Sequence, residues 1–235
     1  MTGGTFDDDD DDGGAAELFC RPAAAQTPRL LIVPGLHDSG PAHWQSWLQA
    51  SWRPSARVAQ RDWHMPDLER WSARIDATLE RAGGGGPWIA AAHSFGCLAL
   101  VHHLARSVAA GPHSPIRAVL LVAPAEPDRF GLADALPQRP LGLPAMLVGS
   151  QNDPWMSAGS AQRWAGRWGC QWVNLGEAGH INAEAGFGPL PLARRWALAM
   201  QQRLAQQQRQ RTIEAAEAAF PRSSHEQRSF HSFAK

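Results

Sequence analysis

Short apolar runs alternate with segments of helical periodicity along most of the chain. The apolar runs are bounded by turn residues and have the length of β-strands, at positions 29–33, 57–60, 88–92, 117–123, 145–149 and 171–174. Several are apolar at every position, which is typical of parallel strands covered on both faces. The pattern therefore predicts about six parallel strands.

Between these runs, apolar residues recur at three- and four-residue steps, the spacing of one helix face. One series occupies positions 68, 71, 75 and 79, and another occupies 192, 196, 200 and 204. A third helix is expected over 157–168, where Gly169 would end it. Strands that alternate with helices predict an α/β fold, a three-layer sandwich with helices on both faces of a doubly wound parallel sheet.

The two ends of the chain depart from this pattern. Asp7 to Asp12 form an unbroken acidic run between glycine pairs, which repels itself and has nothing to bury. We expect a flexible acidic leader over 1–27, with cation binding as the alternative, and an α/β domain over 28–205. The Gln- and Arg-rich segment 206–235 is expected to be helical to about Phe220 and disordered beyond Pro221.

Composition and charge narrow the function classes. A chain of 235 residues fits one domain with tails. Its 22 basic and 22 acidic residues balance, which gives no basis for binding nucleic acid or an anionic membrane. The longest apolar stretch, 118–125, is too short to cross a bilayer. Three scattered cysteines favour a cytoplasmic protein without a disulfide framework or a zinc site.

The candidate chemistry begins at Ser94, in the pentapeptide Ala92-His93-Ser94-Phe95-Gly96. The serine lies between an apolar strand and a helical segment, and the residues two positions before and after it are very small. This is the arrangement of a nucleophile elbow, whose sharp turn lifts the hydroxyl above the sheet. With Ala92 where glycine is usual, the pentapeptide alone is a weak signal for an elbow, because many strings of this kind are only tight turns.

Other loops are expected to meet Ser94 at the carboxyl edge of the sheet. After the first strand, a glycine-containing loop places the backbone N–H of Leu36, with that of His37 as the alternative, where an oxyanion hole would need it. The second donor would be the N–H of Phe95. On its own, this segment would be interpreted as an ordinary strand-to-helix loop.

Two aspartates compete as the acid of a catalytic triad. Asp153 follows the fifth strand, where most serine hydrolases of this architecture place their acid, and Asp128 follows the fourth. Asp153 is preferred, although capping of the turn before Pro154 is an alternative role. His180 follows the last strand in a loop of small residues. The order Ser94, Asp153, His180 is that of α/β-hydrolases.

Four blocks of sequence together resemble one family. They cover 34–47, 92–97, 150–154 and 176–182, with Gly186-Phe187-Gly188 beyond them. In order and spacing they are similar to the small serine hydrolases of the retinoblastoma-binding-protein and YdeN type, a branch of the α/β-hydrolase superfamily. The likeness spans roughly 29–204 and implies that Ser94, Asp153 and His180 are nucleophile, acid and base. The retinoblastoma-binding pattern Leu-x-Cys-x-Glu is not met.

The resulting hypothesis is a serine hydrolase that cleaves small carboxylic esters, or amides, through an acyl-enzyme on Ser94. Neither metal nor cofactor is expected. Residues 124–143 are too few for a large lid, so we expect an open pocket, with candidate lining residues His37, Trp44, Trp155 and Phe187. The alternative function is a binding or regulatory protein with little turnover, and an acyltransferase is a third option.

Overall fold

The computed structural model describes residues 27–83, 86–109 and 114–219. Its elements in chain order are β1 (Arg29–Val33), α1 (Trp44–Ala50), β2 (Ser55–Arg57), α2 (Leu68–Arg81), β3 (Trp88–Ser94), α3 (Phe95–Ala109), β4 (Ile116–Pro124), the 3-10 turns η1 (Pro127–Phe130) and η2 (Ala133–Ala135), β5 (Ala145–Gly149), α4 (Ala158–Trp168), β6 (Gln171–Asn174) and α5 (Pro191–Ala219). The expected leader, except its last residue, and the end of the expected tail lie outside the described residues.

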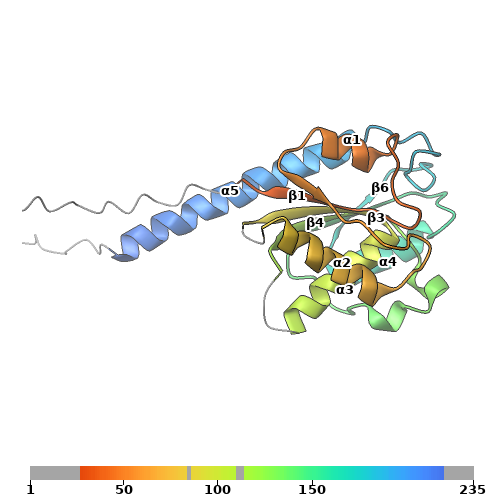
Figure 1. The fold of residues 1–235 in the computed structure, drawn as a ribbon, viewed down its shortest axis with the longest axis horizontal. Helices are drawn as coiled ribbons and strands as arrows, with labels where there is room; N and C mark the ends of the chain where they lie inside the picture. Colours follow the sequence, from red (N-terminus) through yellow and green to blue (C-terminus); the bar gives the residue numbers. More distant parts are fainter. Residues whose placement is uncertain (1–26, 84–85, 110–113, 220–235) are drawn as a thin grey trace, which may run out of the picture.

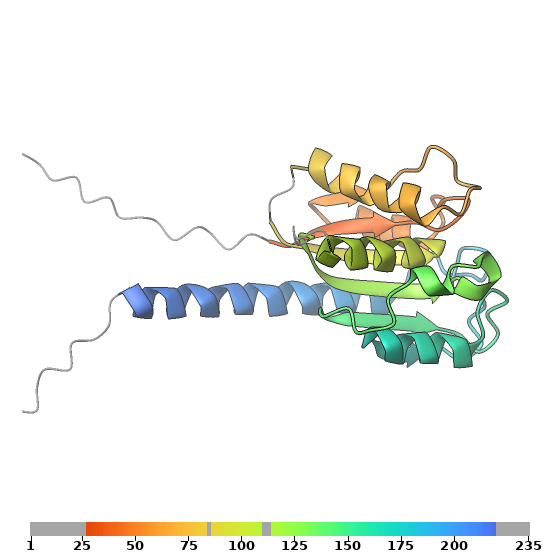
Figure 2. The same ribbon diagram turned by 90° about the horizontal axis from the view of Figure 1, so that it is seen from below.

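All six strands form one parallel sheet in the order β2-β1-β3-β4-β5-β6. Helices α1 and α5 cover one face of the sheet, and α2, α3 and α4 cover the other (Figure 1). The predicted α/β class, the six parallel strands and the three layers are therefore confirmed. Because the strands are parallel, their carboxyl ends all lie at one edge of the sheet, as Figure 2 shows.

One predicted strand was misplaced. The sequence predicted 57–60, whereas β2 runs from Ser55 to Arg57. Val58 still donates its N–H to Ile32, but the carbonyl of Ala59 accepts from the guanidinium of Arg74 instead of from a strand. β2 lies at one of the two edges of the sheet and is only half-buried. It therefore lacks the continuous apolar run by which the central strands were found.

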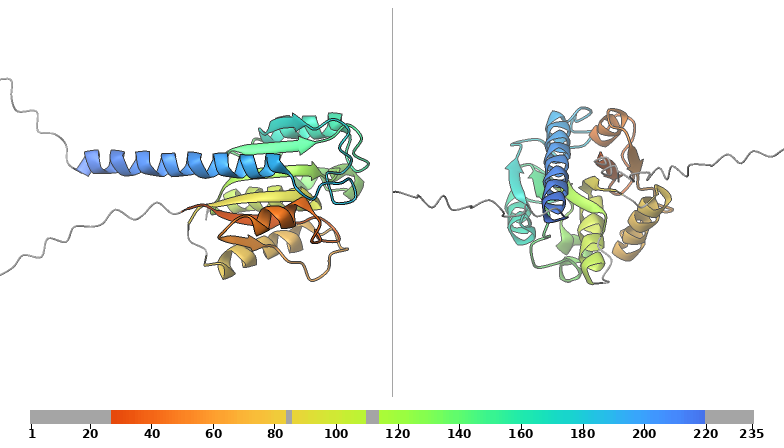
Figure 3. Two further views of the ribbon diagram at one scale, coloured as in Figure 1. Left: turned by 90° about the horizontal axis from the view of Figure 1, so that it is seen from above. Right: turned by 90° about the vertical axis from the view of Figure 1, so that its left-hand side faces the viewer.

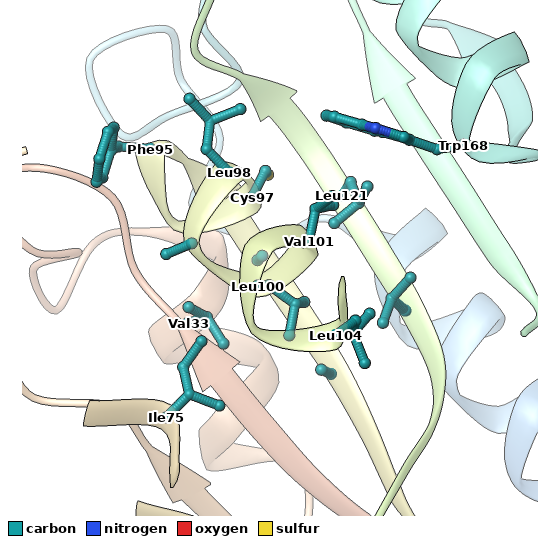
Figure 4. Packing of buried hydrophobic residues seen from close by; sticks show 14 of the residues in the cluster. Val33, Ile75, Phe95, Cys97, Leu98, Leu100, Val101, Leu104, Leu121 and Trp168 are labelled. Carbon is teal, nitrogen blue, oxygen red and sulfur yellow. The ribbon is translucent and has the colours of Figure 1, made fainter. Parts of the chain in front are cut away.

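Each face of the sheet carries its own apolar core. Phe95 through Leu104 of α3 are all buried, and Figure 4 shows Leu98, Val101 and Leu104 of this helix packed near Val33 and Leu121 of the sheet. The opposite core joins Trp44 and Leu48 of α1 and Trp196 of α5 to β1, β3 and β4. The two cores hold the central strands rigidly between helices.

The helix ends follow local sequence signals. The side chain of Ser157 accepts from the N–H of Ser160 at the start of α4, and Gly169 ends that helix with a φ of 67°. Helix α5 includes the predicted series that starts at Leu192 and continues without a break to Ala219. Its last turns extend past the sheet (Figure 3).

Gln45 links helix α1 to the central strands. It is fully buried, and its Nε2 group donates to the carbonyls of Val33 at 3.1 Å and Ala91 at 3.0 Å. Its Oε1 atom accepts from the hydroxyl of Ser39 at 2.6 Å. One side chain therefore satisfies polar groups of β1, of β3 and of the loop between β1 and α1.

Replacing Gln45 with alanine should remove a donor from two carbonyls of the central strands and the acceptor of the buried Ser39 hydroxyl. We expect Gln45→Ala to lower the free energy of unfolding by about 2–4 kcal/mol, because a buried polar group that loses its partner keeps its desolvation cost. Urea denaturation measures the change. The matched control is Gln162→Ala on the exposed face of α4, with an effect of at most about 0.5 kcal/mol. Equal losses in both variants would contradict this role of Gln45.

Candidate active site

The turn between β3 and α3 presents Ser94. Its φ is 52°, in the left-handed region that non-glycine residues seldom adopt. Two glycines allow the close approach of the first loop, because a Cβ at Gly35 would lie 2.7 Å from Ser94 Cβ and one at Gly96 would lie 2.3 Å from the oxygen of Pro34. Ala92 is fully buried. The local geometry is that of a nucleophile elbow.

A chain of hydrogen bonds connects Ser94, His180 and Asp153. His180 Nε2 lies 3.0 Å from Ser94 Oγ, and Nδ1 lies 3.0 Å from each carboxylate oxygen of Asp153. Because a carboxylate can only accept, Nδ1–H donates to Asp153 and Nε2 accepts from the serine hydroxyl. The ring is 9% exposed and the Asp153 side chain 2%. In this tautomer, Nε2 is ready to take a proton from Ser94.

Asp153 makes both contacts that its sequence position allowed. Its Oδ1 atom accepts from the N–H of Trp155 at 2.8 Å, which caps the turn, and also contacts the imidazole. The competing Asp128 lies in η1 with an exposed side chain. Among the described residues, Asp153 alone supplies a carboxylate to the His180 ring.

The loop that follows β5 also fixes the loop that carries His180. Asn152 Oδ1 accepts from the N–H of Gly179 at 2.7 Å, and the hydroxyl of Ser150 donates to the Gly179 carbonyl at 2.7 Å. Gly179 has a φ of 55°, which favours glycine. These contacts place the imidazole by holding the backbone one residue before it.

Within the part of the chain that the structure describes, two backbone N–H groups near Ser94, those of Leu36 and Phe95, find no acceptor. The N–H of His37 donates to the carbonyl of Trp63 at 3.1 Å, so the alternative oxyanion donor is already occupied. The N–H of Leu36 has no acceptor among the described residues. Phe95 is the first residue of α3, where the helix offers its N–H no partner.

A cavity of about 410 Å³ opens beside Ser94 and His180. Its lining includes Leu36 and two of the candidate pocket residues, His37 and Trp155, together with Asp38, Gly40, His43, His93, Ala125, Phe130, Asn182, Ala183 and Glu184. The other two candidates lie elsewhere. Trp44 is fully buried and Phe187 is partly buried in the core between the sheet and α1 and α5.

Helical geometry explains the correction at Trp44. Helix α1 begins at this residue, and Trp44 and Leu48 are four positions apart on the same helix face, toward the sheet. The preceding residue, His43, reaches the cavity instead. Phe187, in the loop between β6 and α5, packs against the same core.

Two histidines that the sequence analysis did not assign to the site surround the base. His93 Nε2 donates to the backbone carbonyl of His180 at 2.9 Å, and its ring lies 4.8 Å from the His180 ring. The His43 ring lies 4.7 Å from that of His93, edge to face. The position of His93 next to the serine was the available signal, but its contact with His180 spans 87 positions.

Burial keeps both added histidines uncharged. Burial, with further contributions from Arg57 and His180 and an opposing one from Asp38, lowers the pKa of His43 to about 4. Burial and the nearby His180 hold the pKa of His93 well below its ordinary value. His43 Nδ1 accepts the N–H of Gln45 at the start of α1, which also requires that nitrogen to be unprotonated.

The described part of the chain offers neither a metal centre nor a reactive thiolate as an alternative to Ser94. Among residues 27–83, 86–109 and 114–219, no group of three or more His, Cys, Asp or Glu could hold a metal ion. Burial raises the pKa of the Cys97 thiol well above its ordinary value and that of Cys170 to about 12. Within the same residues, every helix is too short or too polar to cross a bilayer.

A doubly wound parallel sheet with a Ser-His-Asp chain at its carboxyl edge defines the α/β-hydrolase class. Comparison of the sequence with family models makes the assignment more specific. The chain belongs to the serine hydrolase family, whose model matches residues 30–199.

Solved structures agree with this assignment. A protein from Pectobacterium atrosepticum assigned as a YdeN-like hydrolase is 40% identical, with 76% of this chain and 92% of that chain covered and a TM-score of 0.69. The ydeN product of B. subtilis is 18% identical over 74% and 98% of the chains, with a TM-score of 0.58. The esterase domain of a Rhodothermus marinus protein is 13% identical over 77% and 90%, with a TM-score of 0.50.

A search of curated proteins gives no match. The resemblance to YdeN-type hydrolases is nevertheless confirmed by the family match and by the similar structures. The chain is thus a hydrolase of this family, and its substrate has to be inferred from the site.

The depressed pKa of His43 makes stability depend on pH. Unfolding returns His43 to its ordinary pKa of 6.5, whereas the folded value is about 4, so the unfolded chain binds more protons between these values. The contribution of neutral His43 to the free energy of unfolding is therefore fully present above pH 6.5 and is lost as the pH falls toward 4. His43→Asn keeps an acceptor for the Gln45 N–H and should remove about 2–3 kcal/mol of the loss between about pH 7 and about pH 4.5.

Urea denaturation of both proteins at the two pH values measures this difference. His64→Asn is the matched control because His64 is exposed, and its pH dependence should equal that of the wild type. If His43→Asn retains the full acid loss, burial does not depress the pKa of His43.

Proposed function

We propose that the protein is a serine carboxylester hydrolase that acts on small esters, or amides, through an acyl-enzyme on Ser94. The observation that supports this most directly is the Ser94–His180–Asp153 hydrogen-bond chain beside an open cavity. A chain with these lengths is within the reach that proton transfer between nucleophile and base requires. The small-molecule substrate would enter the cavity at the carboxyl edge of the sheet.

The proposed reaction has two steps. His180 Nε2 takes the proton of Ser94 as Oγ attacks the substrate carbonyl, and then gives that proton to the departing alcohol or amine. Water, activated by the same nitrogen, next attacks the acyl-enzyme and releases the acid. The N–H groups of Leu36 and Phe95 would stabilise the oxyanion in both steps.

The charges around the ring favour this cycle. The buried carboxylate of Asp153 stabilises the imidazolium that forms on His180. His93 and His43 stay neutral because burial lowers the pKa of each, so neither places a second positive charge beside the imidazolium. The proton taken from Ser94 therefore has one favourable position in the site, on the His180 ring.

The cavity favours small substrates. Its volume of about 410 Å³ lies near the lower end of the range for ligand sites. Residues 125–144, between β4 and β5, form two short 3-10 turns instead of a lid. Phe130 of η1 and Trp155 supply apolar surface, and Trp155 is 49% exposed. We therefore expect short acyl chains to be preferred to long ones.

Removal of the nucleophile tests the proposal. Ser94→Ala should abolish labelling by a fluorophosphonate probe and lower the kcat for p-nitrophenyl acetate at least about a thousandfold, because the members of a triad act as a unit. Asp153→Asn should cost about 10⁴-fold through the wrong imidazole tautomer. Ser51→Ala and Asp128→Asn, at exposed positions, are the matched controls and should stay active.

The opposite results have definite meanings. The proposal would be contradicted if the probe failed to label the wild type, or labelled it independently of Ser94, and if Ser94→Ala hydrolysed the ester as fast as the wild type. That result would favour a binding or regulatory protein on the same scaffold. Activity that survives Asp153→Asn but not Asp128→Asn would move the acid to η1.

His93 should act as a positioning residue for this reaction. His93→Leu removes the donor to the His180 carbonyl and should lower kcat about 10- to 100-fold with KM nearly unchanged, because small misplacements of a reacting group are costly. His93→Gln retains a donor of similar reach and should recover most of the loss. Steady-state kinetics with the pH profile of kcat measures both. A stability loss in His93→Leu without a change in kcat would assign the contact to packing alone.

A further inference from the structure

The net charge of zero conceals a strong division along the chain. Residues 1–26 contain seven acidic residues and one basic residue, and six of the acids are the run Asp7 to Asp12. The remainder of the chain therefore carries a clear excess of arginine. Such a division raises the question of where on the domain a matching positive surface lies.

Two adjacent hollows along α5 carry this positive surface. One, of about 590 Å³, lies between α5 and the first residues of β5 and β6; the other, of about 550 Å³, lies between α5, α3 and the first residues of β4. They share Leu143 and Pro144. We call the pair the arginine groove, after the five arginines that line it: Arg117, Arg139, Arg195, Arg203 and Arg211.

The charges of the arginine groove are not neutralised by the described residues. All five arginines are exposed, and the lining of the groove includes neither aspartate nor glutamate. Within residues 27–83, 86–109 and 114–219, none of the five forms an ion pair. Arg117 donates only to backbone carbonyls. The groove thus presents five guanidinium groups to an anionic occupant.

Apolar side chains lie between these arginines. Trp196, Met200 and Leu204 of α5 line the hollows, together with Val108, which is 50% exposed. The leader has a matching apolar pair, Leu18-Phe19, between its acidic run and the domain. The lining of the groove and the sequence of the leader therefore both combine charged with apolar residues.

The chain geometry puts this groove within reach of the leader. The first residues of β4, β5 and β6 belong to the amino edge of the parallel sheet, and β1 begins at that same edge with Arg29. Figures 2 and 3 show that β1 starts at this edge of the sheet and that helix α5 runs past it. Residues 13–28 could span up to roughly 50 Å when extended, and β5 lies three strands from β1, about 15 Å away.

We propose that the acidic leader of the same chain binds the arginine groove, with Asp7 to Asp12 on the guanidinium groups and Leu18-Phe19 on the apolar floor. A tethered segment of this length has an effective concentration in the millimolar range. Weak exposed ion pairs therefore suffice for substantial occupancy at low salt. The groove lies at the opposite edge from Ser94, so this inference does not rest on the proposed hydrolase activity.

Paramagnetic relaxation in the full-length protein tests the proposal. A nitroxide on Cys20, in a Cys170→Ser background that leaves Cys97 fully buried, should broaden amide signals of α5 near Arg195 to Arg211 at low salt. The broadening should be lost when Asp7 to Asp12 are all changed to asparagine. It should also be lost at 1 M salt, where the screening length is only about 3 Å.

The arginine variants give the matched comparison. R195Q/R203Q/R211Q should release the leader and lose the broadening, whereas R61Q/R81Q/R163Q, which removes three exposed charges elsewhere, should retain it. Broadening that is absent at low salt, maps to another surface or persists in the asparagine variant would overturn the proposal. Broadening between spin-labelled and isotope-labelled chains in a mixed sample would show that a second copy supplies the leader, and would also overturn it.

Discussion

The left-handed turn at Ser94 is the constraint on which the site depends. A serine with a φ of 52° persists only where its surroundings leave no alternative. Here β3 lies between β1 and β4, α3 begins at the next residue, and the absent side chains of Gly35 and Gly96 let the first loop pass close to the turn. Because two buried cores fix the strand and the helix, the remaining loops need only bring their groups to a point that is already set.

Neutral imidazoles are the second requirement of this arrangement. A base that becomes positively charged during a reaction gains from one buried carboxylate and loses from any other cation nearby. The site surrounds His180 with two further histidines, yet burial depresses the pKa of both. Their contribution is thus geometric: His93 holds the His180 carbonyl, and His43 holds the start of α1 and packs against His93. These two histidines shape the pocket without adding charge to it.

The sequence was most informative where a local pattern determines the structure. β1 and β5 match their predicted bounds because buried parallel strands leave continuous apolar runs. β6, an edge strand that is only partly buried, also matches its predicted bounds. The loop order brought Ser94, Asp153 and His180 to one edge. The bounds of β2 were wrong because its three residues, Ser-Ala-Arg, include only one apolar position. Helical phase explains the misplacement of Trp44, since one residue decides which side chain faces the core and which the cavity. The contacts of Gln45 with Ala91 and of His93 with His180 cross 46 and 87 positions, and no local pattern encodes them.

A parallel sheet separates the two ends of its strands, and the protein uses both edges differently. The carboxyl edge collects the loops that line the cavity beside Ser94, and the amino edge carries arginines along α5 that form no ion pair within the described residues. Equal numbers of acidic and basic residues exclude a strong attraction to external polyanions only where the two kinds of charge are evenly mixed along the chain. In this chain, the acids of residues 1–26 and the arginines of α5 are far apart in sequence but are joined to the same edge of the sheet. The zero net charge is therefore the sum of an acidic segment and an arginine-rich helix, which can neutralise each other within one molecule.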